Sequence, residues 1–169
     1  MELQWPLILF TTFVSWCAGV FATQGYLALK GIGQKAQMRC WIASALLLVI
    51  GGVSVFFHLQ HWERIFNGFG HITSGITQEL IAIIVLAIVA IAYLAAIRKN
   101  EGNVPKWAAV LAIIASIALV TVMGHSYMME ARPAWSNILW IASLLGVACI
   151  LGPATVAVIC ETVNEDPAS

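Results

Sequence analysis

The polar residues of this chain gather in one stretch, from His58 to Glu79, between two long apolar segments. The stretch contains three of the four histidines, one arginine and two glutamates. A neutral imidazole can hydrogen-bond a quinone carbonyl or accept a proton from a quinol hydroxyl, and a carboxylate can accept a proton as well. We therefore expect any proton chemistry of this chain to take place here.

Two residues of this stretch are the main candidates, and each also has a structural explanation. His58 follows an apolar segment, where an ionisable side chain usually faces a cavity or a partner, although it could simply bond a backbone carbonyl. Glu79 precedes another apolar run, where it could accept a proton at the mouth of a pocket. An acid at that place could equally complement the helix dipole, and Ser74 or Thr77 could cap the helix. Taken alone, the residues leave both interpretations open.

The remaining polar residues suggest partners and one alternative function. Arg64 could pair with Glu63 or Glu79, or lie at the level of the lipid headgroups. His125 lies near the end of a later apolar segment, at a depth similar to that of His58. Two histidines on different helices at one depth could bind a haem b, since haem iron takes axial histidines. No histidine lies on the opposite half of the chain's spans, so we do not expect haem.

Composition places the chain in a membrane. It has 169 residues, of which 61% are hydrophobic and 9% charged, against roughly 25% charged residues in a soluble domain. The formal net charge is zero, and without clustered basic residues no nucleic-acid partner is expected. The four cysteines form no C-x-x-C pair, so a metal or iron–sulfur site would have to belong to another protein.

Five apolar segments are each long enough to span the bilayer, which takes roughly 20 residues as a helix. They run over about 5–29, 40–60, 80–97, 107–129 and 135–160. The fold class is therefore all-α, a polytopic transmembrane bundle of five helices, with residues 1–160 as one anchor domain. The first segment has no basic residues before it, so we expect it to stay as a helix rather than to be a cleaved signal.

Basic residues in the connections predict the orientation. The connections at 30–39 and 98–106 hold six of the eight lysines and arginines, and such residues favour the cytoplasmic side. The N-terminus should then lie outside, and the polar tail at 161–169 should lie in the cytoplasm. On this orientation His58, Glu79 and His125 all lie toward the outer face.

The order of residues from His58 to Glu79 resembles the membrane anchor subunit of dimethyl sulfoxide reductase-type molybdopterin oxidoreductases. The matching positions are His58-Leu59, Arg64, Phe66-Asn67 and Ser74-Gly75-Ile76-Thr77-Gln78-Glu79. The opening Trp5-Pro6-Leu7-Ile8-Leu9-Phe10 and the later Arg132-Pro133-Ala134-Trp135 are also similar to that family. Family members usually have about eight helices, whereas five are expected here. Residues 60–63 also differ from the family's usual turn.

The resemblance implies a multi-pass anchor in the bacterial cytoplasmic membrane that serves anaerobic respiration. Its partners would be a ferredoxin-like subunit with four iron–sulfur clusters and a molybdopterin catalytic subunit. The anchor would oxidise menaquinol to menaquinone and pass the electrons to the nearest cluster, without haem and without acting on the terminal substrate itself. The resemblance also implies a quinol site that contains His58 and Glu79, with Arg64 as a weaker member.

Overall fold

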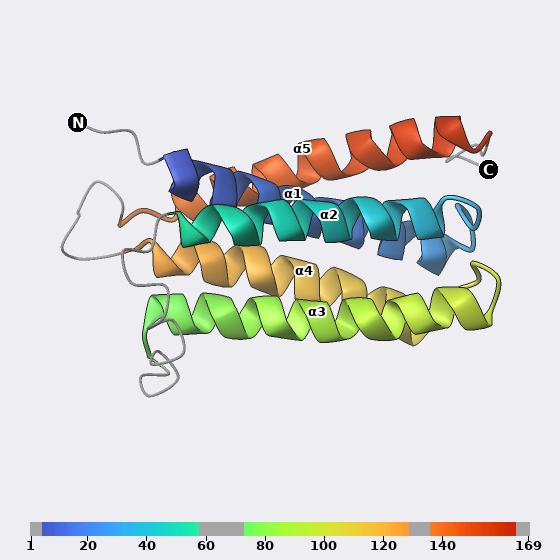
Figure 1. Cartoon of the computed structure of the whole chain (residues 1–169), viewed down its shortest axis with the longest axis horizontal. Helices are drawn as coiled ribbons and strands as arrows, with labels where there is room; N and C mark the ends of the chain where they lie inside the picture. The colour runs from blue at the N-terminus through green and yellow to red at the C-terminus, as the bar shows by residue number, and fades with distance from the viewer. Residues whose placement is uncertain (1–4, 58–72, 129–135, 165–169) are drawn as a thin grey trace.

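The computed structural model describes residues 5–57, 73–128 and 136–164, and in these residues the chain forms five α-helices and no strand. The helices are α1 (Trp5–Lys30), α2 (Gln37–Phe56), α3 (Gly75–Lys99), α4 (Lys106–Ser126) and α5 (Leu139–Thr162). They lie roughly along one long axis and alternate in direction (Figure 1). All five are long and apolar enough to cross a membrane, which confirms the predicted all-α transmembrane bundle.

The helix boundaries differ from those that apolar content predicts. α2 ends at Phe56 rather than near residue 60, and α3 begins at Gly75, before the apolar run that starts at residue 80. α5 begins at Leu139 and continues to Thr162, two residues into the predicted tail. Hydropathy marks which residues can lie in lipid, whereas the backbone hydrogen bonds decide where a helix starts and stops.

The first helix is the centre of the bundle. α1 packs against α2, α4 and α5, while α3 packs mainly against α4 and contacts α2 little. Two glycines allow the contact between α1 and α5. A Cβ atom added to Gly152 would come within 2.3 Å of the backbone of Gly19, so only residues without a side chain fit at this crossing.

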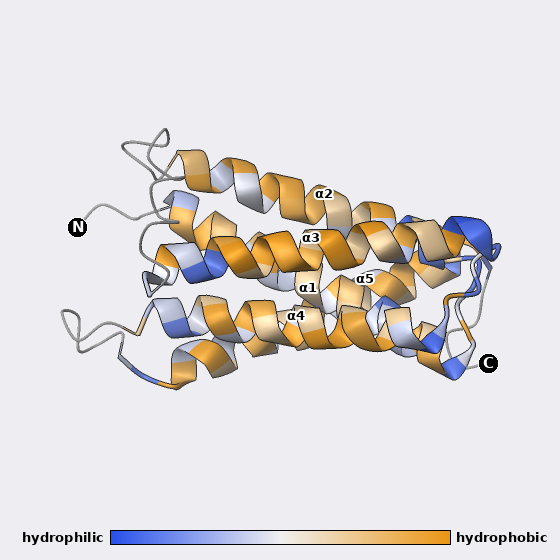
Figure 2. Cartoon of the chain, turned by 90° about the horizontal axis from the view of Figure 1, so that it is seen from below, coloured by the Kyte–Doolittle hydropathy of each residue, from blue (hydrophilic) through white to orange (hydrophobic). Residues whose placement is uncertain are grey.

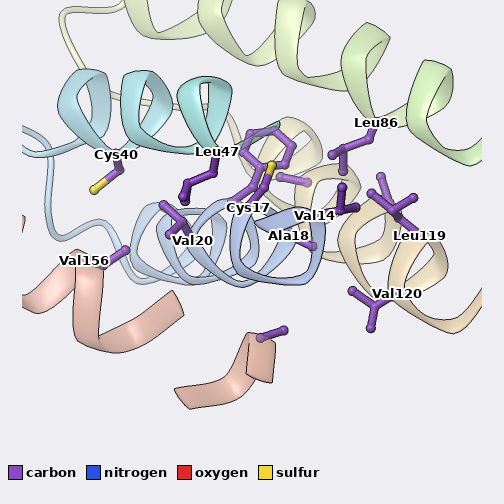
Figure 3. Close-up of a cluster of buried hydrophobic side chains, with 14 of the residues drawn as sticks. Val14, Cys17, Ala18, Val20, Cys40, Leu47, Leu86, Leu119, Val120 and Val156 are labelled. Atoms are coloured by element: carbon purple, nitrogen blue, oxygen red, sulfur yellow. The ribbon is translucent and has the colours of Figure 1, made fainter. Parts of the chain in front are cut away.

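Small and branched apolar side chains fill the space around α1. Figure 3 shows Val14, Cys17 and Val20 of α1 among side chains from the surrounding helices, including Leu119 of α4 and Val156 of α5. The outer surfaces of the helices carry exposed apolar residues such as those of α3, where a bilayer would replace water as the solvent. The core is therefore built from van der Waals contact between close-packed helices, as in membrane bundles generally.

Among the residues that the structure describes, charged side chains lie toward the ends of the bundle and not along its middle. The end where α1 and α3 finish is strongly hydrophilic (Figure 2) and carries the described lysines and arginines, which are Lys30, Lys35, Arg39, Arg98, Lys99 and Lys106. At the opposite end, α2 and α4 finish and α3 and α5 begin (Figure 1). We refer to these as the basic end and the Glu79 end of the bundle.

A buried cluster of neutral polar groups joins three helices near the basic end. The Tyr93 hydroxyl of α3 donates to Gln37 Oε1 of α2 at 2.9 Å and lies 3.3 Å from the backbone carbonyl oxygen of Gln24 in α1. Gln37 Nε2 donates to the same carbonyl oxygen at 3.2 Å. The Tyr93 ring also packs edge-on against Phe21, with 5.2 Å between the ring centroids. Because α2 and α3 otherwise contact each other little, this cluster ties them together.

Candidate functional site

Glu79 lies on the buried face of α3, near the beginning of the helix. Only 8% of its surface is exposed, and Thr77 in the preceding turn is buried as well. Ser74 occupies the N-cap position, but its side chain makes no capping hydrogen bond. The first turn of α3 contains no acidic residue, so Glu79 stands beyond the turn in which the helix dipole acts strongly. Helix capping and the dipole therefore do not account for a buried carboxyl here.

The partner of Glu79 is a serine from the end of the next helix. The Ser126 hydroxyl of α4 bonds Glu79 Oε1, and it also lies 2.9 Å from the backbone carbonyl oxygen of Met123. A hydroxyl has one proton to donate and two lone pairs that can accept. Ser126 can donate to an ionised Glu79, or it can accept from a protonated Glu79 and donate to Met123. The same contact thus suits both protonation states of the carboxyl.

Glycines bring the three helices of this end close together. A Cβ atom added to Gly75, the first residue of α3, would lie 2.9 Å from the Ser126 Cβ atom. A Cβ atom added to Gly124 would lie 2.8 Å from Ile141 of α5. The helices can approach this closely only where a side chain is missing, and the approach places Ser126 beside Glu79.

Tyr127 completes the described part of the site. It follows α4 directly, and its ring lies 6.4 Å from that of Trp140 in α5, measured between centroids. Burial, and to a smaller extent the negative charge of Glu79, raise the pKa of the Tyr127 phenol above its ordinary value. The phenol therefore stays neutral at physiological pH and can serve only as a hydrogen-bonding group.

Of the other predicted site residues, the structure describes only His125. His58 and Arg64 lie outside the described residues, as do His61 and His71, so their assignment to a quinol site stays a prediction. His125 is described, and it is exposed at the end of α4. The haem alternative combined His125 with His58 at a similar depth, and since His58 lies outside the described residues, the structure provides no support for it.

Sequence reasoning missed Ser126 and Tyr127. Both follow His125 at the end of an apolar segment, at the same end of the bundle as Glu79. Their position in the sequence could have drawn attention to them as polar residues at a similar depth. Nothing in the sequence shows, however, that Ser126 faces Glu79, because the pair is 47 residues apart and meets only through helix packing.

The described residues provide little for metal binding. Within residues 5–57, 73–128 and 136–164, no group of three or more histidine, cysteine, aspartate or glutamate side chains could hold a metal ion. Cys17, Cys40 and Cys160 are buried in the bundle and Cys149 is exposed on its surface.

Five apolar helices of spanning length define the chain as a multi-pass membrane protein. The family model described as "DMSO reductase anchor subunit (DmsC)" matches residues 1–168, essentially the whole chain. The chain therefore belongs to the DMSO reductase anchor subunit family. No curated protein and no solved structure shows a significant match to it.

Membership in this family defines the general role of the chain. It is a membrane anchor subunit of a DMSO reductase-type complex, in which it associates with a molybdopterin catalytic subunit and an iron–sulfur subunit. This confirms the membrane location predicted from composition, and the family and classes of partner predicted from the resemblance at His58–Glu79. The oxidation of quinol and the residues that carry it out need a separate argument.

Proposed function

We propose that this anchor oxidises menaquinol at the Glu79 end of the bundle and delivers the two electrons to the iron–sulfur subunit. The observation that carries the proposal is a carboxyl that is buried in an apolar bundle yet hydrogen-bonded by Ser126. Ionisable residues within membrane helices are costly, and they commonly mark sites of ion, proton or substrate binding. The chain belongs to a family of membrane anchor subunits, and a quinol is a lipid-soluble two-electron reductant that can reach such an anchor from the bilayer.

The proton balance assigns the residues their roles. Oxidation of a quinol to a quinone releases two electrons and two protons, and the protons need acceptors that can pass them to water. His58 accepts a hydrogen bond and a proton from one quinol hydroxyl, and Glu79 takes a proton and releases it to the aqueous phase. Arg64 is the third proposed member and lies in the same connection as His58. The iron–sulfur clusters of the partner accept the electrons.

An apolar cavity between α2 and α3 fits the tail of such a substrate. Its volume is about 180 Å³, and its lining includes Trp41 and Leu48 of α2 and Leu86 and Ala90 of α3. Leu86 lies seven residues after Glu79, two helical turns along the same buried face of α3. A quinol with its head near Glu79 could therefore extend its isoprenoid chain into an apolar space before it reaches the lipid.

The positions of the basic residues support one orientation of the bundle across the membrane. Because lysine and arginine favour the cytoplasmic side, the basic end of the bundle faces the cytoplasm of a bacterial cell, and the Glu79 end faces outward. Protons taken from quinol at Glu79 are then released on the outer side. The iron–sulfur subunit docks on the same end, where α2 and α4 finish (Figure 1).

A change at His58 tests the proposal in the intact complex. Substitution His58→Ala should abolish reduction of the terminal acceptor with menaquinol as donor, because the first proton acceptor is missing. A soluble reduced dye that feeds the catalytic subunit directly should still support full activity. The matched control is His125→Ala, which removes an exposed histidine at the same end and should leave both activities unchanged. Unchanged quinol oxidation in His58→Ala would rule out this assignment.

A further inference from the structure

Ser126 is the only hydrogen-bond partner of the Glu79 side chain among the described residues, and its hydroxyl has two acceptors within reach. Serines inside helices commonly bond a backbone carbonyl three or four residues earlier, and Ser126 has this option in the carbonyl of Met123 at 2.9 Å. It has a second option in the Glu79 carboxyl, from a different helix. The one hydroxyl proton cannot serve both acceptors fully at the same time.

We propose that Ser126 is a positioning residue for Glu79, whose hydroxyl rotates between Glu79 and Met123 as the carboxyl gains and loses its proton. This inference rests on the proposed quinol oxidation. With Glu79 ionised, Ser126 donates to Oε1. When Glu79 takes the quinol proton, its carboxyl donates to Ser126 Oγ, and the Ser126 hydroxyl donates to the Met123 carbonyl oxygen. The carboxyl keeps its position and its hydrogen bond to Ser126 in both states.

The apolar surroundings of Glu79 explain why this rotation would matter. An unsatisfied polar group in an apolar bundle is costly, so a carboxyl that Ser126 could bond in only one protonation state would resist the change to the other. Tyr127 is the described titratable group whose pKa is raised by the charge of Glu79, and His125 on α4 is exposed. The described parts of α1, α2 and α5 at this end carry no Asp, Glu, Lys, Arg or His side chain. Within these residues, Ser126 alone hydrogen-bonds the carboxyl.

The close contact between α3 and α4 fixes the distance that this mechanism requires. Gly75 leaves just enough room for Ser126, because a Cβ atom at Gly75 would meet the Ser126 Cβ atom at 2.9 Å. Substitution Gly75→Ala keeps both the carboxyl and the hydroxyl but forces them apart. This variant therefore tests whether the alignment of the carboxyl and the hydroxyl matters, and not only their presence.

Steady-state kinetics of the intact complex test the inference. Ser126→Ala should lower kcat for menaquinol oxidation by about 10- to 100-fold, the usual result of misplacing a catalytic group, with a much smaller change in KM. Ser126→Thr retains a hydroxyl and should recover most of the rate, while Gly75→Ala should behave like Ser126→Ala. The matched control is Ser116→Ala, a buried serine of the same helix whose hydroxyl has no partner, and it should have no effect.

Infrared spectroscopy without quinol gives a second readout that is independent of turnover. The carboxyl band of Glu79 is assigned by its loss in Glu79→Gln. In Ser126→Ala the protonated band at acidic pH and the carboxylate band at alkaline pH should both shift, and in Ser116→Ala neither should. Bands that do not shift in Ser126→Ala would overturn the inference while leaving the proposed function in place. Full quinol oxidation by Glu79→Gln would overturn both.

Discussion

The two ends of the bundle each contain a buried polar cluster, and the clusters differ in one chemical respect. Near the basic end, Tyr93, Gln37 and the Gln24 carbonyl form a network of neutral groups. At the other end, Glu79 and Ser126 form a pair in which one member can change its charge. Both clusters join residues that are distant in the sequence, on different helices. Only the second cluster can take up a proton and release it.

The comparison separates polar groups that hold helices together from polar groups that carry chemistry. Neutral hydrogen bonds between membrane helices contribute about 0.6 kcal/mol on average, and they keep their geometry at any physiological pH. A buried carboxyl stabilises little and must be supplied with partners in two states. We therefore expect substitutions at the basic end to reduce stability, and substitutions at the Glu79 end to reduce quinol oxidation.

The largest expected loss of stability comes from placing a carboxyl in the neutral cluster. Gln37→Glu removes the donor to the Gln24 carbonyl and buries a charge that has no basic partner in the cluster. The free energy of unfolding in detergent micelles should fall by about 3 kcal/mol. The exposed Gln34→Glu is the matched control and should change it by less than about 0.5 kcal/mol. Equal stability of Gln37→Glu and Gln34→Glu would contradict the comparison, because the neutral cluster would then tolerate a buried charge.

Removing the tyrosine hydroxyl should have a smaller effect. Tyr93→Phe keeps the ring contact with Phe21 but leaves Gln37 Oε1 without its donor. Unfolding should become easier by about 1 kcal/mol, with menaquinol oxidation by the assembled complex unchanged. The control is Tyr26→Phe, since Tyr26 is 53% exposed. Loss of quinol oxidation in Tyr93→Phe would place chemistry at the basic end and contradict the comparison.

The smallest expected effect concerns the second link between α2 and α3. Trp41 Nε1 of α2 donates to the Ala90 carbonyl oxygen of α3 at 2.8 Å, and Trp41→Phe removes this bond. The unfolding free energy should fall by about 0.6 kcal/mol, the average for such bonds in a membrane bundle. Trp107→Phe changes a tryptophan that is 57% exposed and should be neutral. A neutral Trp41→Phe would leave the Gln37–Tyr93 bond as the main polar link between these helices.

The sequence predicted the architecture well because apolar runs of spanning length leave few alternatives. All five helices and the family followed from hydropathy and from the residues between His58 and Glu79. The predicted beginning of α3 was wrong by several residues, because the helix already includes polar residues before the apolar run, which hydropathy excludes. That error made Glu79 look like a residue of the first turn, where the helix dipole would have explained it.

The site was predicted only in part, and the reason is geometric. Glu79 could be singled out as an acid next to a membrane segment, but its contact with Ser126 depends on how α3 packs against α4. That packing depends on the missing side chain of Gly75, and the sequence does not show that this glycine contacts α4. His58 and Arg64 lie outside the described residues, so the resemblance remains the basis for their assignment.

The central claim is that Glu79 accepts a proton from quinol, and Glu79→Gln in the intact complex tests it most directly. Glutamine has nearly the same shape and can still hydrogen-bond Ser126, but it cannot take up a proton. Menaquinol-dependent reduction of the terminal acceptor should fall by about 100-fold or more, while dye-driven reduction and complex assembly stay at the wild-type level. Menaquinol-dependent reduction at the wild-type rate would contradict the claim.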